Sequence, residues 1–170
     1  RIDGAPIPED TLCAMIAEAQ PAFDRIGPSF FEATVALSLQ YFAREGVDLV
    51  VVEVGLGGRL DATNIVEAEV AIITSIALEH TALLGDTEAK IAREKGGIMR
   101  TGQPVVLGPL SGEAESALHQ QASAREAVLH RTATTTRWDD ARHVLITPRS
   151  CYMVPELDLP GMHQQENAAC

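Results

Sequence analysis

Two polar residues follow apolar runs of the chain in a pattern that could bind a metal ion. Glu53 lies near the end of the run 48–54, and His80 comes shortly after the run 70–76. Ligands bind outside the carboxyl ends of strands in an open parallel sheet, so both side chains reach one cleft if the two strands are neighbours. A carboxylate and an imidazole can share a divalent cation, here Mg²⁺ held with water and phosphate oxygens. The alternative is a Glu53 paired with a buried Arg or Lys and a His80 in solvent.

Glycines and further polar residues come directly after Glu53. The turn 55–58 reads Gly-Leu-Gly-Gly, and glycines let a backbone turn sharply or approach a ligand. It also resembles the first motif of S-adenosylmethionine-dependent methyltransferases, although no acidic residue ends the next predicted strand. The polar stretch 59–64 could bind a substrate, or could be a solvated loop with an Arg59–Asp61 pair. Lys95 ends a predicted helix, where a cation also complements the helix dipole.

The elements that must position these residues alternate along the middle of the chain. Apolar residues at helical spacing predict an amphipathic helix over 8–26 that Pro21 kinks or ends. A capping-box pattern at Ser29 and Glu32 predicts a second, largely buried helix to about residue 45. Predicted strands are 48–54, 70–76, 104–107 and 128–130, and predicted helices are 87–95 and 113–125. The β-branched runs without alternation indicate strands covered on both faces. Beyond residue 131 we expect edge strands or a hairpin, and a helix begins near 166. The pattern predicts a doubly wound α/β domain.

Composition excludes several classes of protein. Lys plus Arg is 13 and Asp plus Glu is 24, which gives a net charge of −11. So acidic a chain is not expected to bind nucleic acid or an anionic membrane by general electrostatics. The three cysteines show no CxxC spacing, so we expect neither a disulfide framework nor a zinc knuckle. We do expect a cytoplasmic setting, where thiols stay reduced. No apolar run is long enough to span a bilayer. The chain starts at Arg1, and we expect residues 1–170 to be one partial domain of a longer protein.

Several strings together resemble one enzyme family. They are EVGLGGRLDATN at 53–64, TSI at 74–76 with Glu79 and His80, and REKGGI at 93–98, supported by SFFE at 29–32 and GMHQQENA at 161–168. They resemble the central domain of folylpolyglutamate synthase/dihydrofolate synthase, in the Mur ligase superfamily. The resemblance implies a mostly parallel sheet flanked by helices, as in the ATPase-type central domain of those ligases.

The resemblance also implies a reaction and roles for residues. The family joins glutamate to a pteroate or folate with ATP, through an acyl phosphate and with Mg²⁺. Glu53 and His80 would be magnesium ligands, and Lys95, carbamylated by carbon dioxide, would serve a second magnesium; His80 and Lys95 would be catalytic. The remaining implied contacts are Phe30, Phe31, Arg59 and Asp61 at the pterin or pteroate and Asn167 near the adenine. A monomer is implied.

The family's phosphate-binding loop, G-x-x-G-K-S/T, does not occur in these residues. We therefore expect the segment by itself to be inactive as a ligase. We also expect apolar surface to be uncovered and a strand edge to be open. A non-enzymatic remnant that folds partly or binds a partner stays an alternative.

Overall fold

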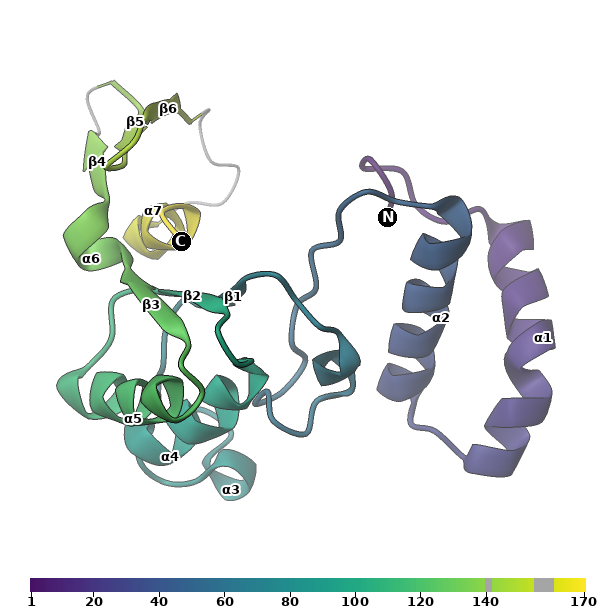
Figure 1. Cartoon of the computed structure of the whole chain (residues 1–170). Coiled ribbons are helices and arrows are strands. Elements are labelled where there is room, and N and C mark those ends of the chain that lie inside the picture. Colours follow the sequence, from purple (N-terminus) through teal and green to yellow (C-terminus); the bar gives the residue numbers. More distant parts are fainter. Residues whose placement is uncertain (140–141, 155–160) are drawn as a thin grey trace. The chain divides into compact units, whose positions relative to one another are not determined.

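The computed structural model of the chain describes residues 1–139, 142–154 and 161–170 (Figure 1). Its contacts divide these residues into two compact units. The first comprises Arg1–Leu56 and Asp61–Ile65, and the second comprises Gly57–Leu60 and Val66–Cys170. The second unit holds a parallel sheet with flanking helices, so the predicted α/β class is confirmed.

The first unit is built mainly from two helices, α1 (Glu9–Ile26) and α2 (Phe30–Glu45), with the short 3₁₀ helix η1 (Ala62–Ile65). Helix α1 continues through Pro21 and ends at Gly27, so the prediction that Pro21 ends the helix is wrong. The predicted capping box of α2 is present. Ser29 Oγ accepts a hydrogen bond from the Glu32 amide at 3.2 Å, and the Glu32 carboxylate accepts one from the Ser29 amide at 2.7 Å.

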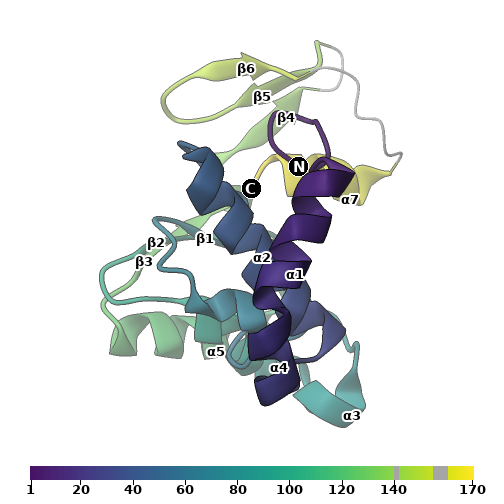
Figure 2. The same cartoon turned by 90° about the vertical axis from the view of Figure 1, so that its right-hand side faces the viewer.

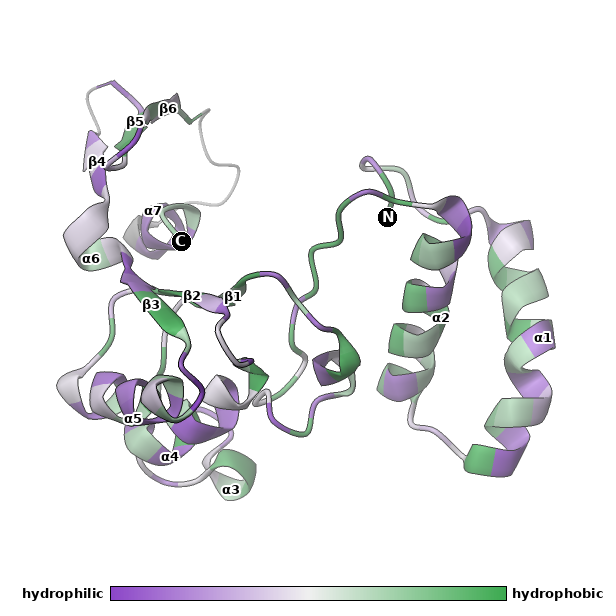
Figure 3. Cartoon of the chain, in the orientation of Figure 1, coloured by the Kyte–Doolittle hydropathy of each residue, from purple (hydrophilic) through white to green (hydrophobic). Residues whose placement is uncertain are grey.

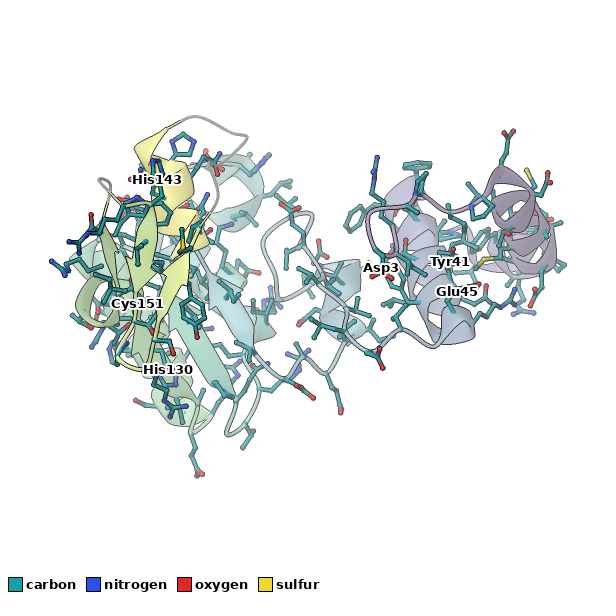
Figure 4. All side chains as sticks on the ribbon, turned by 90° about the horizontal axis from the view of Figure 1, so that it is seen from above. Asp3, Tyr41, Glu45, His130, His143 and Cys151 are labelled. Atoms are coloured by element: carbon teal, nitrogen blue, oxygen red, sulfur yellow. The ribbon has the colours of Figure 1, made fainter. Side chains whose placement is uncertain are left out.

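Helix α2 is not buried, which corrects the sequence prediction. None of its residues is buried, and Phe30 is 89% exposed. Figure 3 shows hydrophobic and hydrophilic residues mixed along the helix. Tyr41, labelled in Figure 4, packs against Phe42 with ring centroids 6.2 Å apart. A helix that is apolar around much of its girth needs cover on every side, and in its own unit the described neighbours are α1 and η1.

The predicted strand over 48–54 does not form. No regular strand is assigned there, and no ladder joins these residues to a described strand. Leu49 is 80% and Val51 is 90% exposed. β-Branched residues favour strands because they pack on a pleated surface beside a neighbouring strand. Without such a neighbour they do not stabilise a strand.

The second unit contains the parallel sheet in the order β1 (Ala71–Ile73), β2 (Pro104–Leu107) and β3 (Val128–Arg131). Between β1 and β2 lie α3 (Thr81–Leu84), α4 (Glu88–Lys95) and the 3₁₀ turn η2 (Gly96–Ile98), and between β2 and β3 lies α5 (Gly112–Ala124). Thr87 caps α4 by accepting a hydrogen bond from the Lys90 amide at 3.2 Å. The three strands, α4 and α5 match predicted elements, although β1 is shorter than expected, and α3 and η2 were not predicted.

Helices α4 and α5 pack on the same face of the sheet (Figures 1 and 2). Both crossovers step in the same direction along the sheet and crossovers are right-handed, so both helices fall on one face. The core between them is Ala71, Ile73, Ala92, Met99, Val105, Leu107, Ala114, Ala117, Leu118 and Ala122. On the opposite face Ile72 is 48% exposed and Val128 is 52% exposed. The prediction of strands covered on both faces is therefore wrong here, and the expectation of uncovered apolar surface agrees with these exposures.

The rest of the second unit is an antiparallel sheet between two helices. The short helix α6 (Thr132–Thr135) precedes β4 (Arg137–Asp139), β5 (Val144–Ile146) and β6 (Cys151–Met153), and α7 (Met162–Ala168) follows. The predicted hairpin is confirmed, but the threonine run is helical. Its threonine hydroxyls donate hydrogen bonds to backbone carbonyls earlier in the chain, as Thr135 Oγ1 does to the Arg131 carbonyl at 2.6 Å. The last helix begins at 162, earlier than the predicted 166.

Candidate functional site

The glycine-rich turn packs on the end of α4. The Arg59 amide donates to the Glu94 carbonyl at 2.9 Å. The Arg59 guanidinium donates to the Glu94 carboxylate through Nε, at 3.1 and 3.2 Å, and through Nη2, at 3.1 Å. A Cβ built on Gly58 would lie 2.8 Å from the Lys95 carbonyl oxygen and 2.9 Å from that of Glu94. Glycine at 58 thus allows the turn backbone to approach the backbone at the end of α4 closely. At this glycine the close approach is to protein rather than to a ligand.

Lys95 is the last residue of α4, and its side chain is half-buried. Gly97 lies just beyond it, where a Cβ would be 2.4 Å from Arg59 Cβ and 2.6 Å from Arg59 Cα. The backbone on both sides of Lys95 is therefore in close contact with the turn. Within the described part of the chain, the Lys95 amine has no hydrogen bond or ion pair.

His80 is exposed and begins α3 in an uncommon backbone conformation. Its φ is 50° and its ψ is 36°, in the left-handed region. Its carbonyl accepts the amides of Leu83 at 2.9 Å and Leu84 at 3.0 Å, and these bonds hold the conformation. Histidine enters this region more readily than most residues. The imidazole has no hydrogen-bond partner within the described residues.

Asp61 holds the loop of the first unit together. Its carboxylate accepts hydrogen bonds from the Leu56 amide at 2.9 Å, the Thr63 amide at 2.9 Å and Thr63 Oγ1 at 2.5 Å. Burial acts to raise the pKa of Asp61, but the bonds from Thr63, Leu56 and the Gly55 amide outweigh it and the pKa is lowered. Arg59 pairs with Glu94 within the second unit, and the alternative of an Arg59–Asp61 pair, whose members lie in different units, stays a prediction.

The other predicted residues of the first unit are partly or fully accessible. Glu53 is exposed, and its carboxylate accepts no hydrogen bond from the described residues. Phe31 is 41% exposed, and its ring lies against Gly55, where a Cβ would be 2.5 Å from Cζ. Phe30 projects from the first turn of α2 into solvent.

Asn167 lies on α7, and Cys170, just after this helix, lies at the carboxyl ends of two parallel strands. Its Sγ would be 3.2 Å from a Cβ on Gly108, the residue after β2. The side chain of Thr132, the residue after β3, hydrogen-bonds to the same thiol. Burial raises the pKa of the Cys170 thiol. This edge of the sheet is where open α/β sheets bind ligands.

The predicted metal ligands come from both units. Glu53 belongs to the first unit, and His80 and Lys95 belong to the second. Among the described residues no group of three or more His, Cys, Asp or Glu is arranged to hold a metal ion. The predicted set includes a carbamylated lysine, which is none of these residue types, so the set stays a prediction. None of the helices described is both long and apolar enough to cross a bilayer.

Known proteins with this sequence pattern are folate enzymes. No protein-family model matches the chain. The dihydrofolate synthase/folylpolyglutamate synthase of Escherichia coli is 38% identical over 169 residues, covering 99% of this chain and 39% of the relative. The probable bifunctional folylpolyglutamate synthase/dihydropteroate synthase of Haloferax volcanii is 46% identical over 127 residues, covering 72% of this chain and 15% of the relative.

Solved structures agree with the sequences. The AMPPCP complex of folylpolyglutamate synthase, matched at 31% identity, superposes with a TM-score of 0.89 over 99% of this chain and 45% of that one. Escherichia coli FolC bound to DHPP and ADP superposes with a TM-score of 0.85 at 37% identity, over 99% of this chain and 40% of that one. By sequence and fold, the chain belongs with the folylpolyglutamate/dihydrofolate synthases. It spans about two fifths of the length of most of these synthases.

Two residues that join the elements of this synthase-like segment were not singled out from the sequence. Glu94 lies within the quoted string 93–98 and could have been found as the acidic partner of Arg59. Gln121 lies in the last turn of α5 and donates to the Arg93 carbonyl of α4 at 3.0 Å. No motif marks Gln121, because the contact depends on the packing of α5 against α4.

Proposed function

We propose that the chain is part of an ATP-dependent ligase that joins L-glutamate to a dihydropteroate or folate carboxylate through an acyl phosphate. The relatives named above are folylpolyglutamate/dihydrofolate synthases, and one solved relative is a complex with AMPPCP and folate. The methyltransferase alternative has no support from these relatives. Since the chain spans only part of each relative, the reaction belongs to the complete gene product.

One observation carries the assignment of roles. The side chains of Glu53, His80 and Lys95 have no hydrogen-bond partner within the described residues, whereas Arg59 and Asp61 hold other parts of the chain. Polar groups that stabilise a loop are expected to be paired internally, and groups that bind a ligand are expected to be available. The three uncommitted residues are the ones that the family resemblance assigns to metal binding.

The donor chemistry of these residues fits Mg²⁺ when Lys95 is a carbamate. The neutral Lys95 amine attacks the carbon of CO₂, an N–C bond forms, one C=O electron pair moves to oxygen, and a nitrogen proton goes to solvent. The cation becomes an anion whose oxygens, with the Glu53 carboxylate, are ligands that magnesium prefers, and His80 adds a nitrogen ligand. Bound magnesium neutralises charge on the phosphate oxygens during transfer.

The remaining predicted residues would recognise the substrates. The exposed Phe30 can stack on a pterin ring, and the Phe31 ring, packed on Gly55, would border the same substrate. Arg59, which binds Glu94, and Asp61, which binds Leu56 and Thr63, would shape this border by holding their own stretches of the loop in place. The remaining assignment places Asn167, on α7 beside the strand ends, near the adenine of ATP. We further propose a cytoplasmic monomer that binds neither nucleic acid nor membrane.

The test measures phosphate release by the complete gene product with ATP, dihydropteroate or folate, and glutamate. Glu53→Gln, His80→Ala and Lys95→Ala should each lower turnover at least about a hundredfold, since each removes a ligand of the charge-neutralising ion. Lys90→Ala is the matched control, because Lys90 lies on the same helix and pairs only with the exposed Asp86. Near-normal turnover in the three variants would refute the assignment.

A second measurement examines the lysine directly. Lys90 and Lys95 are the lysines of these 170 residues, so Lys90→Ala and Lys95→Ala show whether either one carries a carbamate formed from ¹³C-bicarbonate. One ¹³C carbamate resonance should persist in Lys90→Ala and disappear in Lys95→Ala. Carbamate spectra that are the same for Lys95→Ala and the wild type would contradict the proposed modification.

A further inference from the structure

The end of α4 is held by a residue from a different helix. Gln121 Nε2 donates a hydrogen bond to the Arg93 carbonyl at 3.0 Å. This carbonyl is one of the last four of α4, which have no partner inside a helix. Arg93 precedes Lys95 by two residues, so the bond acts on the turn that carries the lysine.

Packing brings the same amide against the residue after Lys95. A Cβ built on Gly96 would lie 2.0 Å from Gln121 Oε1 and 2.8 Å from Leu118 Cδ2. Oε1 is buried and has no hydrogen-bond donor among the residues that the structure describes. A buried acceptor without a donor is unfavourable, and an apolar side chain at 121 would avoid it. The presence of a side-chain amide at position 121 is therefore explained by the hydrogen bond that its nitrogen donates to α4.

The opposite side of the same turn is also held. The Arg59 amide bonds to the Glu94 carbonyl at 2.9 Å, and Gly58 lies against the carbonyls of Glu94 and Lys95. The carbonyls of two successive residues before Lys95 thus receive donors from two separate parts of the chain. Helix ends usually fray, so this arrangement restricts the backbone of Lys95 more than the helix alone would.

We propose that Gln121 is a positioning residue for Lys95. The proposal rests on the proposed role of Lys95 as a carbamate. Gln121 fixes the last turn of α4, and so fixes where the Lys95 nitrogen meets CO₂ and the metal ion. Without the bond the turn moves, the carbamate loses part of the interaction that stabilises it, and more CO₂ is needed to form it.

The test uses the complete gene product with Gln121→Met, which keeps the volume and removes the donor, and Gln121→Ala. At ambient CO₂, kcat should fall about ten- to hundredfold, as expected for a misplaced catalytic group, with KM for ATP little changed. Added bicarbonate should restore much of the loss in both variants and leave the wild type unchanged. Gln120→Ala, the exposed neighbour on α5, is the matched control and should resemble the wild type.

Three kinetic outcomes and one from hydrogen exchange would overturn the proposal, and the kinetic outcomes separate it from the proposed function. If Lys95→Ala stays active, both fail. If Lys95→Ala is inactive but Gln121→Met has wild-type kcat, only the positioning role fails. If Gln121→Met loses activity that bicarbonate does not restore, Gln121 has a merely structural role. Hydrogen exchange of residues 92–98 should be faster in Gln121→Met than in Gln120→Ala, and equal rates would also refute the proposal.

Discussion

Replacing Gly97 by alanine tests whether the contact between the glycine-rich turn and α4 stabilises the chain. The new Cβ would lie 2.4 Å from Arg59 Cβ and 2.6 Å from Arg59 Cα. The second of these atoms is backbone, so no side-chain rotation relieves the overlap. The turn must move away, and the hydrogen bond from the Arg59 amide to the Glu94 carbonyl is strained or lost.

The expected cost follows from three terms. Overpacking of a close contact costs about 1–3 kcal/mol, and the weakened backbone hydrogen bond costs about 0.5–1.5 kcal/mol. Alanine lowers the backbone entropy of the unfolded chain, which stabilises the folded chain by about 0.4–1 kcal/mol and offsets part of this cost. We therefore expect Gly97→Ala to lower the free energy of unfolding by about 2 kcal/mol, from the sum of these terms.

Urea unfolding followed by circular dichroism measures this difference. With an m-value of about 2 kcal/mol/M, the midpoint should fall by about 1 M. Gly112→Ala is the control, because nothing lies within 4 Å of its built Cβ and Gly112 is helical. That variant should be as stable as the wild type or slightly more stable. Equal stability of Gly97→Ala and Gly112→Ala would refute the reasoning.

Two further predictions concern titration and accessibility. The lowered pKa of Asp61, relative to its ordinary value of 3.8, stabilises the folded chain above that value, and this contribution is lost as the pH falls through the folded pKa. The stability difference between wild type and Asp61→Asn in urea unfolding should therefore shrink below about pH 4, and a constant difference would contradict the role of the Thr63 bonds. The raised pKa and partial burial of Cys170 should make it react more slowly with iodoacetamide than the exposed Cys13 and Cys151, as mass spectrometry of the peptides can measure. Equal rates at the three thiols would contradict the contact of Cys170 with the strand ends.

Local signals in the sequence determined many of the elements and the family. The capping pair Ser29 and Glu32 and the apolar run 104–107 act over a few residues, so the sequence predicts them well. The string 53–64 is long and specific enough to identify the family resemblance. Glu53 and His80 have no hydrogen-bond partner among the described residues, and their role as metal ligands stays a prediction, because the sequence cannot place them together.

Tertiary contacts decided what those signals could not. The run 48–54 has the composition of a buried strand, but none of the described strands pairs with it, and strand formation depends on such a neighbour. Ile72 is exposed because both crossover helices pack on the other face of the sheet. Gln121 reaches Arg93 across 28 positions of sequence, through the packing of α5 on α4. Such pairings depend on how distant segments come together, and no local pattern of residues records them.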